Sequence, residues 1–95
     1  MSKFQLIELW FSDLLAAAAP VLSDVERDEI QRFIDVGEYG LALEVAVDIY
    51  AEEKKITSPA VIALIERLAE AMDVKAMPLL QRLAGRSSSH GINRQ

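Results

Sequence analysis

The sequence predicts an all-α protein, a compact bundle of four to five helices around one hydrophobic core. Apolar residues recur at three- and four-residue spacing, the period of a helix that buries one face, and helix-start and helix-stop residues interrupt this pattern at short intervals. The chain has 95 residues, 52% apolar and 26% charged, which suits a single core. We therefore expect one helical domain over residues 1–85 and a flexible tail over residues 86–95, where little can be buried.

The first expected helix runs from Phe4 to Ala19 and stops at Pro20, which cannot continue a helix. The second begins at the capping box Ser23-Asp24-Val25-Glu26, in which the hydroxyl and the carboxylate each satisfy a free backbone N–H. It should run to Val36, with Gly37 as its left-handed stop. The residues expected inward are Leu6, Ile7, Trp10, Phe11, Leu14 and Leu15 in the first helix, and Val25, Ile30, Phe33 and Ile34 in the second.

The third segment, from Glu38 to about Lys54, is ambiguous at first sight. Its apolar residues alternate in a way that also fits a strand (Leu41, Leu43, Val45, Val47, Ile49). A run of about 16 residues without a turn is ordinary for a helix and long for a strand. In addition, Glu44, Asp48 and Glu52 recur at every fourth residue. We therefore predict a helix.

Two further helices are expected after Lys55. Ser58-Pro59 reads as a cap followed by proline at the first helical position, which opens a fourth helix that ends near Met72. Its inward residues would be Val61, Ile65, Leu68 and Met72. A short last helix should be capped by Asp73, carry Pro78 near its first turn and end at Ala84, before Gly85.

The sequence lacks the residues that the common catalytic, metal-binding and phosphate-binding sites require. The sequence has no cysteine, and its one histidine, His90, lies in the expected tail without a companion ligand. Gly37-Glu38-Tyr39-Gly40 is read as a helix stop followed by a helix start, because a phosphate loop needs more glycines and a following Lys-Ser or Lys-Thr. We expect no enzymatic activity, no cofactor and no metal site. With no secretory signal and no membrane-spanning run, a cytoplasmic protein without a membrane partner is expected.

Acidic residues are concentrated in the middle of the chain. Residues 24–53 hold ten acidic and two basic residues, a balance of −8, whereas the rest of the chain sums to +3. The stacked charges of Glu44, Asp48 and Glu52 repel each other by about 0.2–0.5 kcal/mol per pair. Two interpretations stay open: a face that keeps the protein soluble, or a surface for a basic protein partner. A nucleic-acid partner is disfavoured, because phosphates require a basic surface.

The two tyrosines of the third helix also have two interpretations. Tyr39 and Tyr50 are eleven residues apart, about three helical turns, so they project from one side of that helix. Packing in the core is the default for both. Tyrosine is also a favoured anchor at protein interfaces.

The stretch Phe33–Glu44, followed by Glu52-Glu53 and then Ile56-Thr57-Ser58-Pro59, resembles the immunity proteins of the Maf and contact-dependent growth inhibition systems. The match covers about residues 25–73. The resemblance implies a small helical antitoxin that binds a cognate bacterial toxin domain one-to-one in the cytoplasm. Such toxins are often nucleases with basic clefts, which an acidic helix can fill. The partner-binding residues expected on this basis and from the acidic middle are Asp35, Glu38, Tyr39, Glu44, Asp48, Glu52 and Glu53.

A second resemblance covers the same residues. Gly37-Glu38-Tyr39 followed by Ala42-Leu43-Glu44 is similar to the glycine–tyrosine–alanine spacing of a tetratricopeptide helix pair. That family repeats every 34 residues or so, and no second copy of the pattern occurs in this sequence. The alternative is therefore an adaptor in which a single helical hairpin docks a peptide or a protein partner.

Overall fold

The structure, a computed structural model, describes residues 2–88, with side chains as far as Ala84. Within that range the chain forms five α-helices and no strand, which confirms the predicted all-α bundle. None of these helices is long and apolar enough to cross a membrane. The helices are α1 (Lys3–Ala18), α2 (Asp24–Asp35), α3 (Tyr39–Glu52), α4 (Pro59–Ala71) and α5 (Ala76–Ser88).

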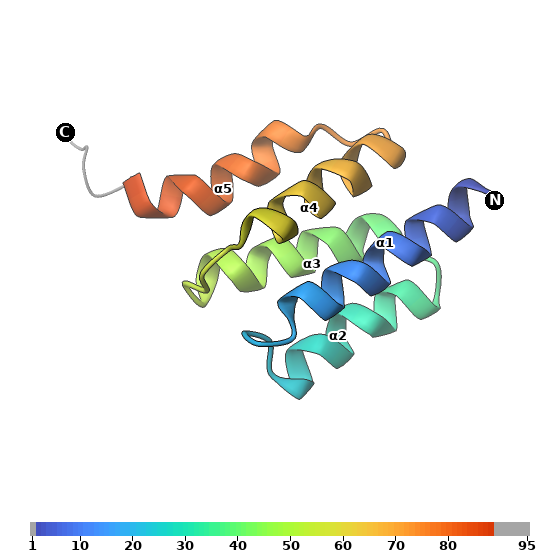
Figure 1. Cartoon of the computed structure of the whole chain (residues 1–95), viewed down its shortest axis with the longest axis horizontal. Coiled ribbons are helices and arrows are strands. Elements are labelled where there is room, and N and C mark those ends of the chain that lie inside the picture. The colour runs from blue at the N-terminus through green and yellow to red at the C-terminus, as the bar shows by residue number, and fades with distance from the viewer. Residues whose placement is uncertain (1, 89–95) are drawn as a thin grey trace.

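The central element is α3, which lies behind α1 and α4 in the view of Figure 1, with α2 on one side and α5 on the other. The main helix pairs are α1 with α4, α2 with α3, and α3 with α5. Each of the first four helices runs antiparallel to the partner it packs against most closely (Figure 1). The outer surface of α3 is therefore bordered by α2 along one edge and by α5 along the other.

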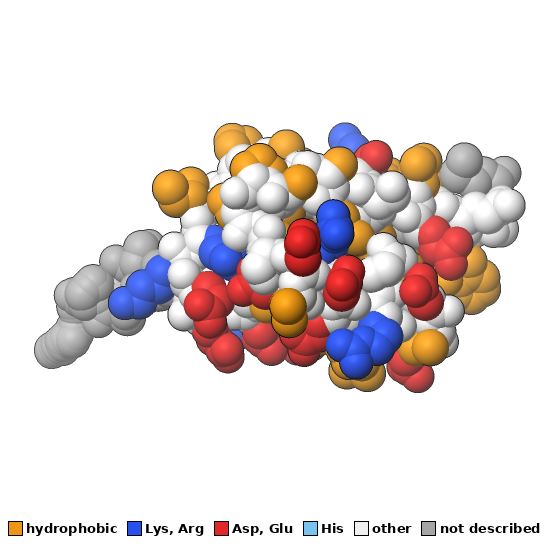
Figure 2. Space-filling view, turned by 90° about the horizontal axis from the view of Figure 1, so that it is seen from below, with side chains coloured by type: hydrophobic (Ala, Val, Ile, Leu, Met, Phe, Trp, Pro, Cys, Tyr) orange, Lys and Arg blue, Asp and Glu red, His pale blue; other side chains and the backbone are white. Residues whose placement is uncertain are grey.

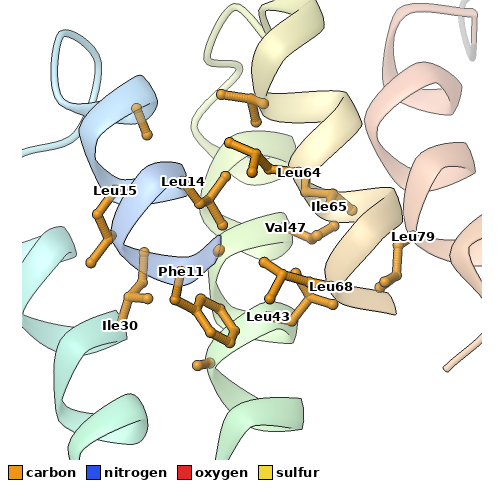
Figure 3. Packing of buried hydrophobic residues seen from close by; sticks show 14 of the residues in the cluster. Phe11, Leu14, Leu15, Ile30, Leu43, Val47, Leu64, Ile65, Leu68 and Leu79 are labelled. Atoms are coloured by element: carbon orange, nitrogen blue, oxygen red, sulfur yellow. The ribbon is translucent and has the colours of Figure 1, made fainter. Parts of the chain in front are cut away.

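The core forms where the inner faces of α1, α3 and α4 meet. Figure 3 shows Phe11 and Leu14 pointing toward Leu43, Val47 and Leu68. Full burial of such a side chain contributes about 1.5–3 kcal/mol relative to its exposed state. The buried cluster takes Ile7, Phe11, Leu14, Leu15 and Ala18 from α1, Ile30 and Ile34 from α2, Ala42, Leu43, Ala46, Val47 and Tyr50 from α3, Val61, Leu64, Ile65, Leu68 and Ala69 from α4, and Leu79 and Leu83 from α5.

The predicted helix starts at Ser23 and Ser58 are confirmed. Ser23 Oγ accepts a hydrogen bond from the Glu26 N–H at 3.1 Å, and the Ser23 N–H donates to Glu26 Oε1 at 2.9 Å, which completes the capping box. Ser58 Oγ accepts from the Val61 N–H at 3.2 Å, with proline at the first helical position. A second capping box, formed by Ser2 and Gln5, opens α1 and was not expected.

Three helices end at a residue in the left-handed region. Gly37 follows α2 with φ 79°, as predicted, and Lys54 and Asp73 follow α3 and α4 with φ 56° each. The expectation that Asp73 caps the last helix was wrong. Asp73 instead closes α4, because its left-handed φ lets the Val74 N–H turn back to the Ala69 carbonyl at 2.8 Å. The last helix, α5, begins at Ala76, with Pro78 in its first turn.

Two other expectations need correction. Val25 is 77% exposed rather than inward, because it lies five residues before Ile30 and therefore about 140° around the helix axis from it. The last helix does not end before Gly85 but continues to Ser88, so glycine at this position does not stop it. The rest of the expected tail, with His90, lies outside the described residues.

Candidate functional site: an acidic groove between α2 and α3

The α2–α3 hairpin brings the two most acidic helices side by side. Its turn is closed at Gly37, where the Glu38 N–H donates to the Phe33 carbonyl at 2.8 Å. At the opposite end, Lys55 Nζ lies 3.2 Å from Glu26 Oε1, and both side chains are about four-fifths buried. This ion pair fixes the start of α2 against the segment that follows α3. Carboxylates from the two helices therefore face a common groove.

The groove has a volume of about 330 Å³ and an unusual lining. Its apolar part is formed by Val45 and Ile49 of α3, which are half-buried. Its polar part consists only of carboxylates: Glu26 and Glu29 from α2, Asp48 and Glu52 from α3, and Glu53 directly after α3. Figure 2 shows acidic side chains spread over the face of the molecule seen from below, with basic side chains interspersed among them.

The five carboxylates differ in how far the chain itself neutralises them. Glu26 is held by Ser23 and Lys55. The backbone hydrogen bond from Ser23 is the largest cause that lowers the pKa of Glu26, and Lys55 adds to it against the opposing effect of burial. Asp48 pairs with Arg82. The remaining three, Glu29, Glu52 and Glu53, are exposed and have no ion-pair partner among residues 2–84, whose side chains the structure describes. We call the edge of α3 that carries this groove the α2 flank.

The edge of α3 that faces α5, the α5 flank, shares Asp48 with the groove but is arranged differently. Arg82 of α5 reaches two stacked carboxylates, with its Nη1 3.5 Å from Glu44 Oε1 and its Nη2 3.1 Å from Asp48 Oδ1. A cation between two like charges removes much of their mutual repulsion, although an exposed pair of this kind stabilises a fold by no more than about 1 kcal/mol. The charge stacking that looked unfavourable in the sequence therefore has a structural partner at two of its three positions.

The structure divides the seven predicted partner-binding residues among several places. Asp48, Glu52 and Glu53 line the acidic groove, and Glu44 faces Arg82. Asp35 accepts a hydrogen bond from Gln31 at 2.8 Å and borders a different hollow, between α1 and α2. Glu38 precedes α3 without making a side-chain cap and lines a third hollow.

Tyr39 connects helices within the molecule. Its hydroxyl donates a hydrogen bond to Glu8 of α1, which is the largest cause that raises the pKa of Tyr39. Its ring lies 6.3 Å from that of Phe11 and 6.1 Å from that of Phe4, measured between centroids. Tyr50 is buried in the core, and burial raises the pKa of its hydroxyl. The default interpretation of core packing is confirmed for Tyr50, and Tyr39 is not among the residues that line the groove.

Sequence reasoning missed three residues that define this surface. Glu26 and Glu29 belong to the acidic middle, but only the antiparallel pairing of α2 with α3 places them opposite Asp48 and Glu52. Their spacing of three residues on one face of α2 was an available signal. Arg82 lies 38 residues from Glu44, and no local pattern links the two.

Other surface features differ in charge from the groove. The hollow between α1 and α2 is larger, about 600 Å³, but Arg27 stands in it together with Glu8 and Asp35, so its charges are mixed. Within the described part of the chain, no three acidic or histidine side chains converge closely enough to hold a metal ion. The groove on the α2 flank is therefore the described hollow in which charge of one sign is most concentrated.

Comparisons with known proteins do not place the chain in a family. Family models, curated proteins and solved structures were searched, and none of them gave a significant match.

Proposed function

We propose that this protein is a cytoplasmic immunity protein, an antitoxin that binds a cognate bacterial toxin domain and neutralises it without catalysis. The partner would be a basic domain, of the kind that nucleases use to hold phosphates, and it would be bound one-to-one. The observation that carries the proposal is the groove on the α2 flank, where Glu29, Glu52 and Glu53 have no ion-pair partner among the side chains of residues 2–84.

The charge of the groove supports binding of a basic protein. Exposed carboxylates that share one sign attract an oppositely charged surface and accelerate encounter. A fold gains nothing from leaving them unpaired, because like charges at helical spacing cost about 0.2–0.5 kcal/mol per pair. The basic cleft of a nuclease would supply the missing cations, and the acidic groove would occupy the place of the nucleic-acid backbone there.

The apolar lining supports a protein partner as well. Val45 and Ile49 lie among the carboxylates, so a partner that covers the groove would bury apolar surface in addition to forming ion pairs. Buried apolar contact contributes affinity, whereas exposed charge contributes mainly to the association rate. A groove with both apolar surface and exposed charge is suited to high affinity and fast association, and protection from a toxin requires both.

The direct test is recovery of the partner followed by a protection assay. The tagged protein would be purified from its native host and its partner identified by mass spectrometry. A large secreted protein encoded immediately upstream would supply the candidate domain directly. We expect a basic domain in a one-to-one complex, toxic when expressed alone and harmless when expressed together with this protein. A recovered domain that stays toxic, or a partner without basic character, would contradict the proposal.

The modest size of the groove favours a second candidate, an adaptor that docks an extended basic peptide. A volume of about 330 Å³ accommodates a few side chains. The two candidate functions differ in the form of the partner: an adaptor needs only a short basic peptide, whereas an immunity protein needs a folded basic domain. If a short basic peptide from the recovered partner binds as tightly as its whole domain, the adaptor is favoured; if only the folded domain binds tightly, the immunity protein is favoured.

A further inference from the structure

The acidic groove continues into an apolar hollow at the far end of α2. This second hollow, about 300 Å³, is lined by Phe33 and Val36, with Glu29 and Arg32 at its sides. Val36 is 69% exposed although it is a large apolar residue, and Phe33 is half-buried against the core. Because Glu29 lines both hollows, they form one continuous surface along α2.

The spacing of the two parts is fixed by the helix that carries them. Glu29 lies on α2, and Val36 is the residue that directly follows its last turn, seven positions later. This separation corresponds to about two helical turns, or about 10 Å along the axis. A partner helix that lies along α2 has the same rise per residue. It would therefore place a basic side chain against the acidic groove and an apolar side chain in the second hollow if those residues were also two turns apart.

We propose that the Phe33–Val36 hollow is an anchor pocket for one large apolar side chain of a basic partner, carried on a helix two turns from Lys or Arg residues that face Glu29 and Glu52. This inference rests on the proposed function and specifies the partner's chemistry. The charged half of the surface sets the rate of encounter. The apolar half holds the complex, because side chains that bury apolar area at the centre of an interface dominate the dissociation rate.

Three synthetic peptides of about 15 residues, held helical by a side-chain lactam because free helices of this length are marginal in water, provide the probe. The first carries lysines on one face and a leucine two turns away on the same face. The second has serine in place of that leucine. The third has the composition of the first, with the leucine moved to the opposite face. Binding to the whole protein would be measured by calorimetry at low ionic strength.

The first peptide is expected to bind about tenfold more tightly than the other two, the effect of burying one apolar side chain. Val36→Gln should reduce this preference to less than about twofold, and Val36→Ile should retain it. Leu9→Gln is the matched control, because Leu9 is also a large exposed apolar residue, on α1. It should leave the preference unchanged. Thermal unfolding of each variant would establish that it is folded.

Equal affinities for the first two peptides would overturn the inference, as would a leucine preference that survives Val36→Gln, or the absence of binding by all three. These outcomes can be distinguished from failure of the proposed function, because the peptides do not depend on any toxin. If the leucine preference holds but no toxin domain is recovered from the host, the anchor pocket stands and the immunity function fails.

Discussion

Along the α5 flank of α3, the carboxylates of Glu44 and Asp48 share the guanidinium of Arg82. Along the α2 flank, Glu29, Glu52 and Glu53 have no ion-pair partner among the described side chains, those of residues 2–84. The two flanks belong to the same helix, are both exposed, and carry the same kind of side chain. They differ in the charge that the neighbouring helix contributes. The α5 helix contributes the cation Arg82, whereas α2 contributes the acidic residues Glu26 and Glu29.

This difference distinguishes carboxylates that are paired within the fold from carboxylates that remain available to a binding partner. The contacts with Arg82 give Glu44 and Asp48 a role in stabilising the fold. This contribution is small, because exposed ion pairs add little to stability. Glu29, Glu52 and Glu53 of the α2 flank gain no comparable contact, because the nearby Lys55 pairs with Glu26. A surface for a basic partner is therefore expected on the α2 flank and not on α3 as a whole.

The largest effect should come from neutralising the α2 flank. The triple variant Glu29→Gln, Glu52→Gln, Glu53→Gln should slow association with the recovered basic domain by about tenfold or more at low salt, because electrostatic steering is lost. Stopped-flow mixing would measure the rate. The matched control is Asp13→Asn, Glu66→Gln, Glu70→Gln, which makes the same change in net charge at exposed positions of α1 and α4. Equal slowing in both variants would mean that net charge, and not this flank, attracts the partner.

A smaller effect is expected where the hairpin turns between the flanks. Gly37 has φ 79°, and no atom lies near the position of an added Cβ, so Gly37→Ala should cost about 1 kcal/mol of folding free energy from backbone strain alone. Lys54→Gly should do the reverse and stabilise the fold by up to about 1 kcal/mol, because Lys54 carries a side chain at φ 56°. Urea unfolding would measure both. Unfolding free energies that shift in the same direction for the two variants would contradict the strain argument.

Removing Arg82 should make the α5 flank resemble the α2 flank. Arg82→Gln leaves Glu44 and Asp48 unpaired, which should lower the free energy of unfolding by less than about 1 kcal/mol. It should also raise the rate of association with a basic domain a few-fold, about twofold to fivefold, because two more carboxylates become available. Urea unfolding and stopped-flow mixing would measure the two quantities. A slower association would show that Arg82 itself contacts the partner.

The smallest effect concerns the pH dependence of the capping box of α2. Since the folded state lowers the pKa of Glu26 below 4.5, its carboxylate contributes stability at neutral pH that is lost as the pH falls through the lowered value. Glutamine can still cap the helix, as Gln5 does in α1. Glu26→Gln should therefore be less stable than the natural protein at pH 7 and converge with it in acid. A constant difference from pH 7 to pH 2 in urea unfolding would contradict this assignment.

The fold was predictable because its signals are local. Helical periodicity identified each helix, and the capping serines at positions 23 and 58 placed two of the starts. The strand-like alternation of the third segment was correctly rejected, since α3 is one helix of 14 residues. The errors fell where two local interpretations compete. Asp73 can cap a helix start or adopt a left-handed helix end, and only the close of α4 at Ala71 decides between them.

The candidate site was less predictable because it depends on pairing between helices. The sign of its charge and its place in residues 24–53 follow from composition. That Glu26 and Glu29 face α3 while Val25 points to solvent follows from which face of α2 packs inward, and that face is set by Ile30 and Ile34 in contact with the rest of the core. The pairing of Glu44 with Arg82 depends on how α5 packs against α3. No local sequence pattern in α3 or in α5 predicts that packing.

If the α2 flank is the surface that a basic partner covers, binding should protect its backbone. Backbone amide hydrogen exchange of the protein, alone and saturated with the recovered basic domain, tests it most directly, because a partner that covers a helix suppresses the local opening on which exchange depends. We expect added protection at the start of α2 and in the second half of α3, around Glu29, Ile49 and Glu52, with α1 and α4 little changed. Added protection confined to α1 and α4, with none at these residues, would contradict it.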